Sequence, residues 1–337
     1  MKCPAVSVVL PFYNAQSTLA ETLDSIRAQT FCDYELLAVD DGSRDNSAHV
    51  VREYAIRDPR IRLLSLPHSG VVDAMNTGVA AAHAPIVARM DADDRMRPER
   101  LRKQKAWLDA NPNIVMVGTQ VRLFPEEAVT DGFRSYIHWQ NACLTPEAIA
   151  DEVYIELPIT NPTTMFRKET IQTLGGYREG NFPEDYELVL RLVHAGHRLA
   201  KVPEVLLDWR ESANRLTWTD GHYSREAFDR VRSSYLICDP RLHTGRPLAF
   251  WGAGRKSRRG GDRLVEEGIR PLAWIDVDPA KIGKHHADAP VVAPAWLKRG
   301  DRPFVLSFVN NYGVRARIGD YLESLGYIRG QDYLMVG

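Results

Sequence analysis

The chain has 337 residues, of which 44% are hydrophobic and 26% are charged, and its formal net charge is −1. This length is generous for a single hydrophobic core, so we expect a globular protein with two domains. A net charge near zero gives no long-range field to attract nucleic acid or an anionic membrane, so we expect no nucleic-acid partner.

Cysteine spacing and hydropathy give a first indication of the compartment. The four cysteines are far apart and include no CxxC pair, which argues against a zinc site and against a disulfide framework. No stretch approaches the roughly 20 apolar residues of a membrane span. We therefore expect a cytoplasmic protein that meets the inner face of a membrane only through peripheral contact.

The N-terminal part of the chain alternates apolar strands with amphipathic helices. Strands are predicted at residues 5–11, 34–39, 61–66 and 86–90, and helices at about 17–29, 46–57 and 70–83. Repeated β-α units with short loops predict a parallel sheet with right-handed crossovers. The carboxyl ends of such strands meet at one edge of the sheet. We therefore expect four segments to be neighbours in space: Pro11 to Asn14, Asp40-Asp41, His68 to Gly70 and Asp91 to Asp94.

The fourth strand ends in Asp91-Ala92-Asp93-Asp94, which places three carboxylates within four residues. Like charges this close raise one another's pKa unless a cation or hydrogen-bond donors neutralise them. A hard divalent cation is the simplest partner, because such ions prefer oxygen ligands. The alternative is a helix cap, since acids also favour a helix N-terminus and a helix is predicted at 99–111.

A second acidic segment, Asp40-Asp41-Gly42-Ser43, follows the second strand. Two acidic clusters on one sheet edge indicate a nucleotide site, where one carboxylate accepts from base or ribose and the other grips phosphates through a metal. Asp, Gly and Ser are also the usual residues of a plain turn, and this reading remains open.

The pattern changes after Pro98. Beyond the helix at 99–111, strands are predicted at 114–124, 161–166, 198–202 and 205–209, and helices at 145–152, 168–174, from Glu184 onward, and at about 220–237. The polar and aromatic loop Tyr177 to Pro183 leads into Glu184-Asp185, an arrangement that suits substrate binding. Capping of the helix by these two acids is the alternative. Arg210 is placed either to contact a diphosphate or to pair with an acid.

The C-terminal residues restart a β-α-β pattern after a linker near residues 240–246. A strand at 248–251 runs into Gly252-Ala253-Gly254, and a strand at 272–275 runs into Asp276. This resembles the opening of a dinucleotide-binding fold, although Ser257 stands where the third glycine would be. Further strands are expected near 291 and 304–307, with a last helix at 314–325. An anionic ligand near Gly252, Gly254 and Asp276 and a docking role are both open.

A combination of motifs carries a family resemblance over residues 5 to about 240. The chain resembles a family 2 glycosyltransferase of the inverting type with the GT-A fold. The motifs, in order, are Val6 to Asn14, Val39 to Ser43, Asp91 to Asp94, Asn161 to Met165 and Glu184-Asp185. The fold class expected is therefore α/β: a GT-A nucleotide-diphospho-sugar transferase domain (1–240) followed by a small Rossmann-like α/β domain (245–337).

The resemblance implies transfer of a sugar from a nucleotide diphosphate sugar to the hydroxyl of a carbohydrate or lipid-linked acceptor, with Mn²⁺ or Mg²⁺. Asp185 is implied as the general base, with Glu184 beside it, and Asp93 as the metal ligand, supported by Asp91. The other implied contacts fall on the nucleotide sugar (Pro11, Tyr13, Asn14, Asp40, Asp41, Asp91, Asp93) and on the acceptor side (Asn161, Tyr177, Arg178, Arg210).

Two rival functions remain at this point. A sugar nucleotidyltransferase also combines an α/β nucleotide fold with metal-binding carboxylates, but it would want a glycine-rich basic loop after the first strand, and Pro11 to Asn14 is neither. A nucleotide-sugar-binding regulatory protein would act through the C-terminal domain. Absence of a QxxRW motif and of membrane helices favours addition of single sugars over polymer extrusion.

Overall fold

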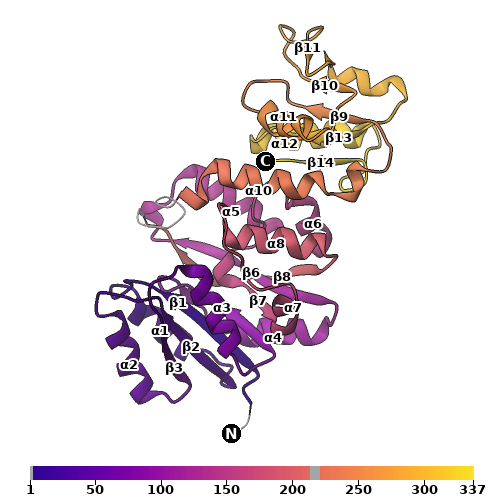
Figure 1. The fold of residues 1–337 in the computed structure, drawn as a ribbon. Helices are drawn as coiled ribbons and strands as arrows, with labels where there is room; N and C mark the ends of the chain where they lie inside the picture. The colour runs from indigo at the N-terminus through magenta and orange to yellow at the C-terminus, as the bar shows by residue number, and fades with distance from the viewer. Residues whose placement is uncertain (1–2, 213–220) are drawn as a thin grey trace. The chain divides into compact units, whose positions relative to one another are not determined.

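The computed structural model describes residues 3–212 and 221–337, which form two compact units, each built on its own sheet (Figure 1). The first unit runs to Ile149 and resumes at Pro158. The second takes in Ala150–Leu157 and the chain from Gly221. Helix α10 (Arg225–Ile237) belongs to the second unit, because it packs on α11 (Arg258–Glu266) there. The domain boundary expected at 240–245 lies beyond this helix.

The first unit opens with the predicted β-α repeat. Strands β1 to β4 alternate with three helices, and β1 pairs in parallel with both β2 and β4 while β2 pairs in parallel with β3. The bounds are β1 Val6–Phe12, α1 Leu19–Arg27, β2 Tyr34–Asp40, α2 Ser47–Arg57, β3 Ile61–Ser65, α3 Val71–Ala81 and β4 Ile86–Arg89. The predicted parallel arrangement of these four strands is confirmed.

Burial explains why the strands of this part could be predicted from the sequence. Every residue of β1 and β2 is buried, and both faces of this half of the sheet are covered by helices. Leu19, Leu23 and Ile26 of α1 join one core with Val8 and Leu10 of β1. Helix α3 packs on the opposite face, where a Cβ at Gly78 would lie 2.4 Å from Val9 Cγ1. Apolar runs covered on both faces are typical of parallel strands.

The rest of the first sheet is mixed, and its full strand order is β3-β2-β1-β4-β7-β6-β8-β5. β7 runs antiparallel to β4 and to β6, and β8 runs parallel to β6. The bounds are β5 Arg95–Met96, α4 Arg100–Ala110, β6 Ile114–Phe124, α5 Asp131–Ala142, α6 Pro146–Glu152, β7 Met165–Arg167, α7 Lys168–Thr173, α8 Glu184–His194 and β8 Arg198–Arg210.

Two local predictions differ from the structure, and one helix was missed. The strand expected at 161–166 begins only at Met165, because Asn161–Thr163 form a 3-10 turn. The two strands expected at 198–202 and 205–209 are one strand, β8. The register with β6 shifts between Thr119 and Gln120, so Pro203, which has no N–H to donate, falls in a bulge. Helix α5 was not predicted, although Thr130 caps it by accepting from Phe133 N.

The second unit has a six-stranded sheet in the order β11-β12-β10-β9-β13-β14, parallel except for the β11–β12 pair. Its bounds are β9 Leu248–Trp251, β10 Ala273–Ile275, β11 His285–His286, β12 Ala289–Val292, β13 Phe304–Ser307, α12 Tyr312–Ser324 and β14 Tyr333–Met335. Strands at 248–251, 272–275 and 304–307 were predicted; β11 and β14 were not. The predicted start of α10 at residue 220 lies outside the described residues.

Segment Ala150–Leu157 is tied to the rest of the second unit by specific bonds. Tyr154 Oη lies 2.8 Å from Asp239 Oδ2, and Tyr154 O accepts from Gly337 N at 2.8 Å. Asp239 also accepts three hydrogen bonds from Arg241, from its backbone N and Nε at 2.9 Å and from its Nη2 at 2.7 Å. These contacts explain why a short segment from the middle of the chain belongs to the C-terminal unit.

Candidate active site

The candidate site lies at the carboxyl edge of the first sheet, where the strand order reverses between β1 and β4. Open α/β sheets bind ligands at such a switch point. Residues after β1, β2 and β4 meet there: Asp41 N donates to Phe12 O at 2.9 Å, and Met90 N donates to Val9 O at 3.0 Å. The expected gathering of these strand ends at one sheet edge is confirmed.

The two acids after β2 are buried and engaged with backbone. Asp40 Oδ1 accepts from Ser43 N at 2.9 Å. Asp41 accepts from the backbone N–H of Ser69 at 2.8 Å and of Gly70 at 3.0 Å, and its Oδ2 lies 2.8 Å from His68 Nδ1. Asp41 therefore fixes the loop that starts α3, and its carboxylate is already occupied by three neighbours. Contact of either acid with a nucleotide base stays a prediction.

Tyr13 and Asn14 shape the same edge. The Tyr13 ring stacks on His68 with centroids 4.1 Å apart, and Tyr13 is 39% exposed. Asn14 adopts a positive φ of 49°, and its Oδ1 accepts from Arg44 N at 2.8 Å. Pro11 lies inside β1, one residue from its end. The exposed Tyr13 and His68 rings, held in a stack, form a flat surface suited to a planar ligand.

Arg89, the last residue of β4, connects the acidic strand end to α8. Its Nε donates to Asp91 Oδ1 at 2.9 Å, and its Nη1 lies 3.6 Å from Glu184 Oε1. The guanidinium is buried and lies 5.9 Å from the centroid of the Tyr177 ring. Asp91 and Glu184 raise the pKa of Arg89 although burial opposes them, so this cation stays charged. Asp91 and the Glu184-Asp185 pair therefore belong to one site.

Asp93 and Asp94 differ in exposure and in role. Asp94 is fully buried, and its Oδ1 accepts from Arg210 N at 2.8 Å. Asp93 is partly exposed, and its backbone carbonyl accepts from Arg210 Nε at 2.6 Å. Helix α4 begins after Glu99, so none of the three acids caps it, and the alternative interpretation of the cluster as a helix cap is wrong. Arg210, expected on the acceptor side, braces the backbone of the acidic loop and also pairs with Glu21.

Arg100 supplies a second buried cation behind the acids. It is wholly buried, its Nη2 donates to Arg89 O at 2.8 Å, and its Nε donates to Gln104 Oε1 at 2.9 Å. Burial lowers its pKa to about 9, while Asp94 and Asp91 act to raise it. Arg100 is therefore still positive at neutral pH and offsets part of the repulsion among the carboxylates.

Glu184 and Asp185 open α8, as predicted. Glu184 is buried and Asp185 partly so, and Asp185 Oδ1 accepts from Tyr186 N at 2.7 Å. Burial raises the pKa of Asp185 to about 7, Glu184 and Asp91 add to the rise, and Arg89 opposes it. In the structure, burial and the neighbouring carboxylates dominate.

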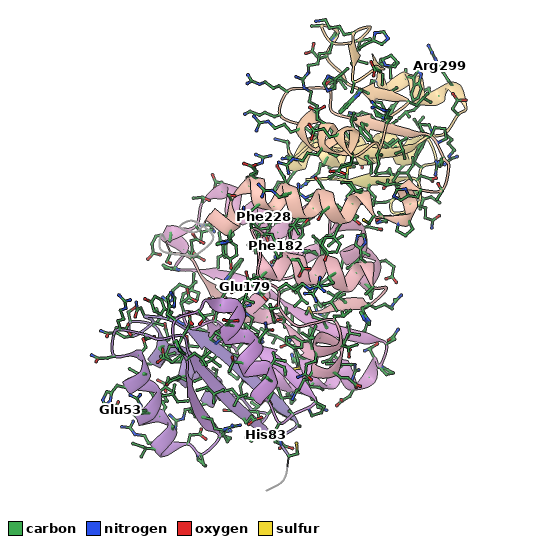
Figure 2. All side chains as sticks on the ribbon, viewed as in Figure 1. Glu53, His83, Glu179, Phe182, Phe228 and Arg299 are labelled. Atoms are coloured by element: carbon green, nitrogen blue, oxygen red, sulfur yellow. The ribbon has the colours of Figure 1, made fainter. Side chains whose placement is uncertain are left out.

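The loop before α8 is held by two side chains that the sequence did not single out. Asn76 of α3 clamps Tyr177 from both sides: its Oδ1 accepts from Tyr177 N and its Nδ2 donates to Tyr177 O, both at 2.9 Å. Arg191 of α8 donates to Gly176 O at 2.7 Å. Glu179 and Phe182, labelled in Figure 2, lie further along this loop. Asn76 and Arg191 thus fix the backbone that leads to the acid pair.

The remaining acceptor-side candidates are placed differently. Tyr177 is buried beside Arg89, and burial raises its pKa to about 12. Arg178 is exposed, with Nη1 3.7 Å from Glu187 Oε1. The carbonyl of Asn161 accepts from Thr164 N, and Thr164 O accepts from Arg89 N at 2.9 Å. Asn161 therefore stands in the turn beside β4, while direct contact of these residues with an acceptor stays a prediction.

The acids present a donor set for a metal shared with a ligand. In the part of the chain that the structure describes, no three His, Cys, Asp or Glu side chains form a metal-binding cluster. Asp91, which also accepts from Arg89 Nε, and Asp93 are partly exposed at the strand end, whereas Asp94 is buried and accepts from Arg210 N. Two carboxylates that leave room for phosphate oxygens are the usual protein share of a Mg²⁺ site. The residues therefore fit such an ion.

The C-terminal candidates come together in the second unit. Gly252 has φ of +118°, and a Cβ there would lie 2.8 Å from Ser257 Cβ. Asp276 pairs with Lys281 at 3.2 Å, and Lys281 Nζ lies 3.4 Å from the position of a Cβ on Gly254. The glycine turn and Asp276 are thus neighbours, and their role in binding a ligand stays a prediction. Across the described residues, no helix is long and apolar enough to span a membrane.

Comparison with known proteins agrees with this geometry. The sequence model of the family described as Glycosyl transferase family 2 matches residues 7–175. EpsE of Bacillus subtilis, named as a glycosyltransferase, is 30% identical over 276 residues, covering 78% of this chain and 96% of EpsE. The amylovoran biosynthesis glycosyltransferase AmsE of Erwinia amylovora is 28% identical over 211 residues, covering 62% of this chain and 77% of AmsE.

Solved structures show the same fold. S. aureus TarS 1–349 in complex with UDP-GlcNAc matches with a TM-score of 0.56 at 19% identity, over 69% of this chain and 66% of that one. The mannosyltransferase PcManGT from Pyrobaculum calidifontis, in complex with GDP-Man and Mn²⁺, matches with a TM-score of 0.51 at 22% identity, over 70% and 63%. The first unit has the GT-A fold. With its family match over half its length and its identity to EpsE, the chain belongs to glycosyl transferase family 2.

Proposed function

We propose that this enzyme transfers a sugar, with inversion, from a nucleotide diphosphate sugar to an acceptor hydroxyl during polysaccharide or glycoconjugate synthesis. The proposal rests on the two contacts of Arg89. Its Nε lies 2.9 Å from Asp91 Oδ1, and its Nη1 lies 3.6 Å from Glu184 Oε1. Arg89 thus joins Asp91, a strand-end carboxylate suited to a metal ion that binds the donor diphosphate, with an acid pair suited to the acceptor. AmsE, a relative, is named for amylovoran biosynthesis, and TarS and PcManGT were solved with UDP-GlcNAc and GDP-Man.

Asp185 is proposed as the general base. The acceptor oxygen attacks the anomeric carbon as the bond to the diphosphate oxygen breaks, and the acceptor proton passes to the Asp185 carboxylate. A carboxylate whose pKa is raised to about 7 holds a proton better than an ordinary one. Proton transfer is most effective when the pKa of the base lies near the working pH. Glu184 is proposed to keep Arg89 in place beside this base.

Asp93, with Asp91, is proposed to hold Mn²⁺ or Mg²⁺ together with the donor diphosphate. When bound, such an ion supplies positive charge to the leaving diphosphate without a proton. Arg210 and Arg100 hold the backbone around these acids, through Asp93 O at 2.6 Å and Arg89 O at 2.8 Å. Their task is to keep the two carboxylates in place as the donor enters.

The test is a donor panel. UDP-, GDP- and dTDP-sugars are incubated with the intact protein and Mn²⁺, and release of nucleoside diphosphate is measured, with water as the acceptor of the sugar. We expect release with one nucleotide class, and a fall of about 10² to 10⁴ in the rate for Asp185→Asn, the usual worth of a general base. Binding of the donor should survive this substitution.

Asp109→Asn is the matched control, because it makes the same chemical change at an exposed position of α4. Its rate should equal that of the native chain. An Asp185→Asn variant with full activity would remove Asp185 from the base role. Release of pyrophosphate instead of nucleoside diphosphate would favour a sugar nucleotidyltransferase, and donor binding without turnover a regulatory protein.

A further inference from the structure

The second unit has a switch point of its own. Its parallel strands follow the order β12-β10-β9-β13-β14, so the direction of chain order reverses between β9 and β13. The loops that leave these two strands touch: a Cβ on Gly252 would lie 3.4 Å from Val309 Cγ2. Ligands of open α/β sheets bind outside the carboxyl ends of the strands at this place.

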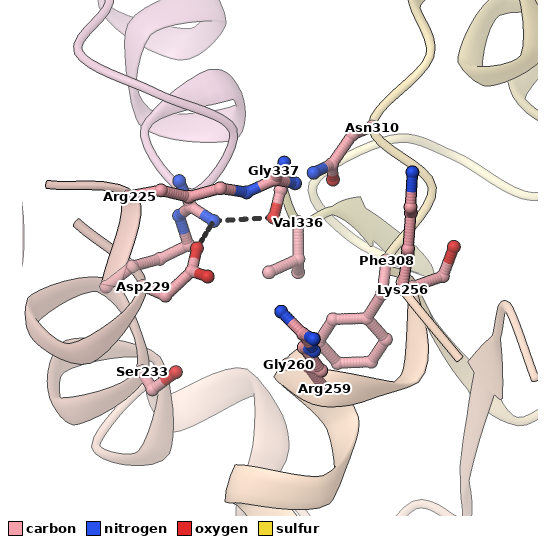
Figure 3. Close-up of a pocket in the computed structure, with 12 residues that line it drawn as sticks. Arg225, Asp229, Ser233, Lys256, Arg259, Gly260, Phe308, Asn310, Val336 and Gly337 are labelled. Carbon is pink, nitrogen blue, oxygen red and sulfur yellow. Dashed lines mark hydrogen bonds and ion pairs between the residues drawn. The ribbon is translucent and has the colours of Figure 1, made fainter. Parts of the chain in front are cut away.

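A pocket lies at this edge, and cations dominate its lining (Figure 3). It is a shallow pocket that is open to solvent, with a cavity volume of about 20 Å³. Arg225 and Arg232 come from α10, while Lys256 and Arg259 come from the start of α11 and the turn before it. Asp229 is the acidic side chain of the lining. Phe308, which is buried and packs on Phe250, forms an apolar wall.

The charges in this pocket are not balanced. Asp229 accepts from Arg232 at 3.0 Å, and Arg232 also donates to Gly337 O at 2.5 Å, so the one acid is occupied by the one buried arginine. Arg225, Lys256 and Arg259 form no salt bridge with any residue in the described ranges, although Arg225 and Arg232 lie near enough to the carboxylate of Glu156 to oppose the rise that burial causes in its pKa.

We propose that this pocket binds a small molecule through a phosphate or diphosphate group. Arg225, Lys256 and Arg259 contact the phosphate oxygens, and Arg232 holds the wall with Asp229. Charge-assisted hydrogen bonds from Arg and Lys to phosphate are among the strong ones in proteins. The proposal does not depend on the sugar-transfer reaction proposed for the first unit.

The experiment is isothermal titration of the intact protein with inorganic phosphate, pyrophosphate and UDP in buffer containing EDTA. The double variant Lys256→Gln/Arg259→Gln removes two pocket cations that are exposed, so the fold should not change. Lys298→Gln/Arg299→Gln is the matched control: the same residue types, exposed in the same unit and outside the pocket (Arg299 is labelled in Figure 2). We expect binding to weaken about tenfold or more in the pocket variant and to stay native in the control.

Comparison of the three titrants shows which kind of phosphate compound the pocket binds. Stronger binding of pyrophosphate than of phosphate indicates a diphosphate, and a further gain with UDP indicates that Phe308 and its surroundings also take the nucleoside. Equal binding by the pocket variant and the control, or binding to phosphatidylglycerol vesicles without binding to any of the three titrants, would overturn the proposal. The donor panel is measured in parallel, so a protein that binds phosphate but transfers no sugar contradicts only the proposed function.

Discussion

The two sheets share the order of their central strands, β3-β2-β1-β4 in the first unit and β12-β10-β9-β13 in the second, and therefore share a switch point. Opposite charges line the two places. The first presents Asp91, Asp93 and Asp185; the second presents Arg225, Lys256 and Arg259. A phosphate ligand can approach the basic edge directly, whereas the acidic edge repels it unless a cation comes too. The same backbone arrangement can thus serve metal-assisted chemistry or direct anion binding, depending on the side chains that end its strands.

The largest expected effect comes from removing the cation that keeps the acidic edge together. Arg89→Met leaves Asp91 and Glu184 without their buried partner, and breaking a buried pair in this way costs about 3–5 kcal/mol of stability. Urea unfolding should show that loss, and sugar transfer should fall with it. Arg52→Met, at an exposed position of α2, is the control. An unchanged unfolding midpoint for Arg89→Met would show that the acids do not need this cation.

Removal of metal should reduce sugar transfer at the acidic edge of the first sheet and leave phosphate binding at the basic edge of the second sheet unchanged. With EDTA, we expect sugar transfer to fall at least about a hundredfold, because a metal at a leaving group contributes several kcal/mol. Phosphate binding to the second unit, measured by calorimetry in the same buffer, should not change. Loss of phosphate binding on metal removal would mean that the two edges do not differ in the way their charges indicate.

The pH dependence of stability tests the acidic edge alone. Burial raises the pKa of Asp185 to about 7, against about 3.9 in an unfolded chain, so the folded state holds this proton more tightly. The stability that the protonated carboxyl contributes is complete below about pH 4 and is lost as the pH rises to about 7. Asp185→Asn cannot ionise. Above about pH 7 it should be more stable than the native chain by up to a few kcal/mol, since one pKa unit is worth about 1.4 kcal/mol.

Thermal melts at about pH 4 and about pH 8 check this sign. The difference between Asp185→Asn and the native chain should be close to zero at the lower pH. Asp109→Asn should show no such trend. A variant that is less stable at the higher pH would mean that ionised Asp185 is favoured by its surroundings.

The smallest effect concerns the loop before the acid pair. Gly176 has φ of +69°, and a Cβ there would lie 2.5 Å from Asn76 Oδ1, so Gly176→Ala should cost about 1–3 kcal/mol. Gly175→Ala is the matched control, since its φ is also positive at +87° but the nearest atom, Arg178 Nη2, is 3.9 Å away. Denaturant unfolding gives both values. Equal losses would show that strain alone, and not the Asn76 clamp, sets the cost.

The sequence predicted the features that repeat locally or follow from topology. Strand and helix periods placed β1 to β4 and their helices, and the rule for parallel strands brought Asp40, Asp41 and Asp91 to one edge. Contacts between distant residues were out of reach: Asn76 meets a partner 101 positions away. Arg89 could have been recognised as a site residue from the sequence, because a charged residue in a buried strand needs a partner. Strands as short as β14, with three residues, are too brief to show a period.

Helix α3 sets the spacing between two parts of the site, the loop held by Asp41 and the loop held by Asn76. Its start is held by Asp41 through Ser69 N and Gly70 N, and Asn76, part-way along it, clamps Tyr177 beside Arg89. Each residue of an α-helix turns the next by about 100° and advances it by about 1.5 Å. An insertion of one residue between Gly70 and Asn76 would therefore turn the clamp away from its loop, although the helix itself would survive. Over evolutionary time, relatives should vary at exposed positions of this stretch such as Asp73, keep the buried Ala74 and Met75 apolar, and gain or lose no residue within it.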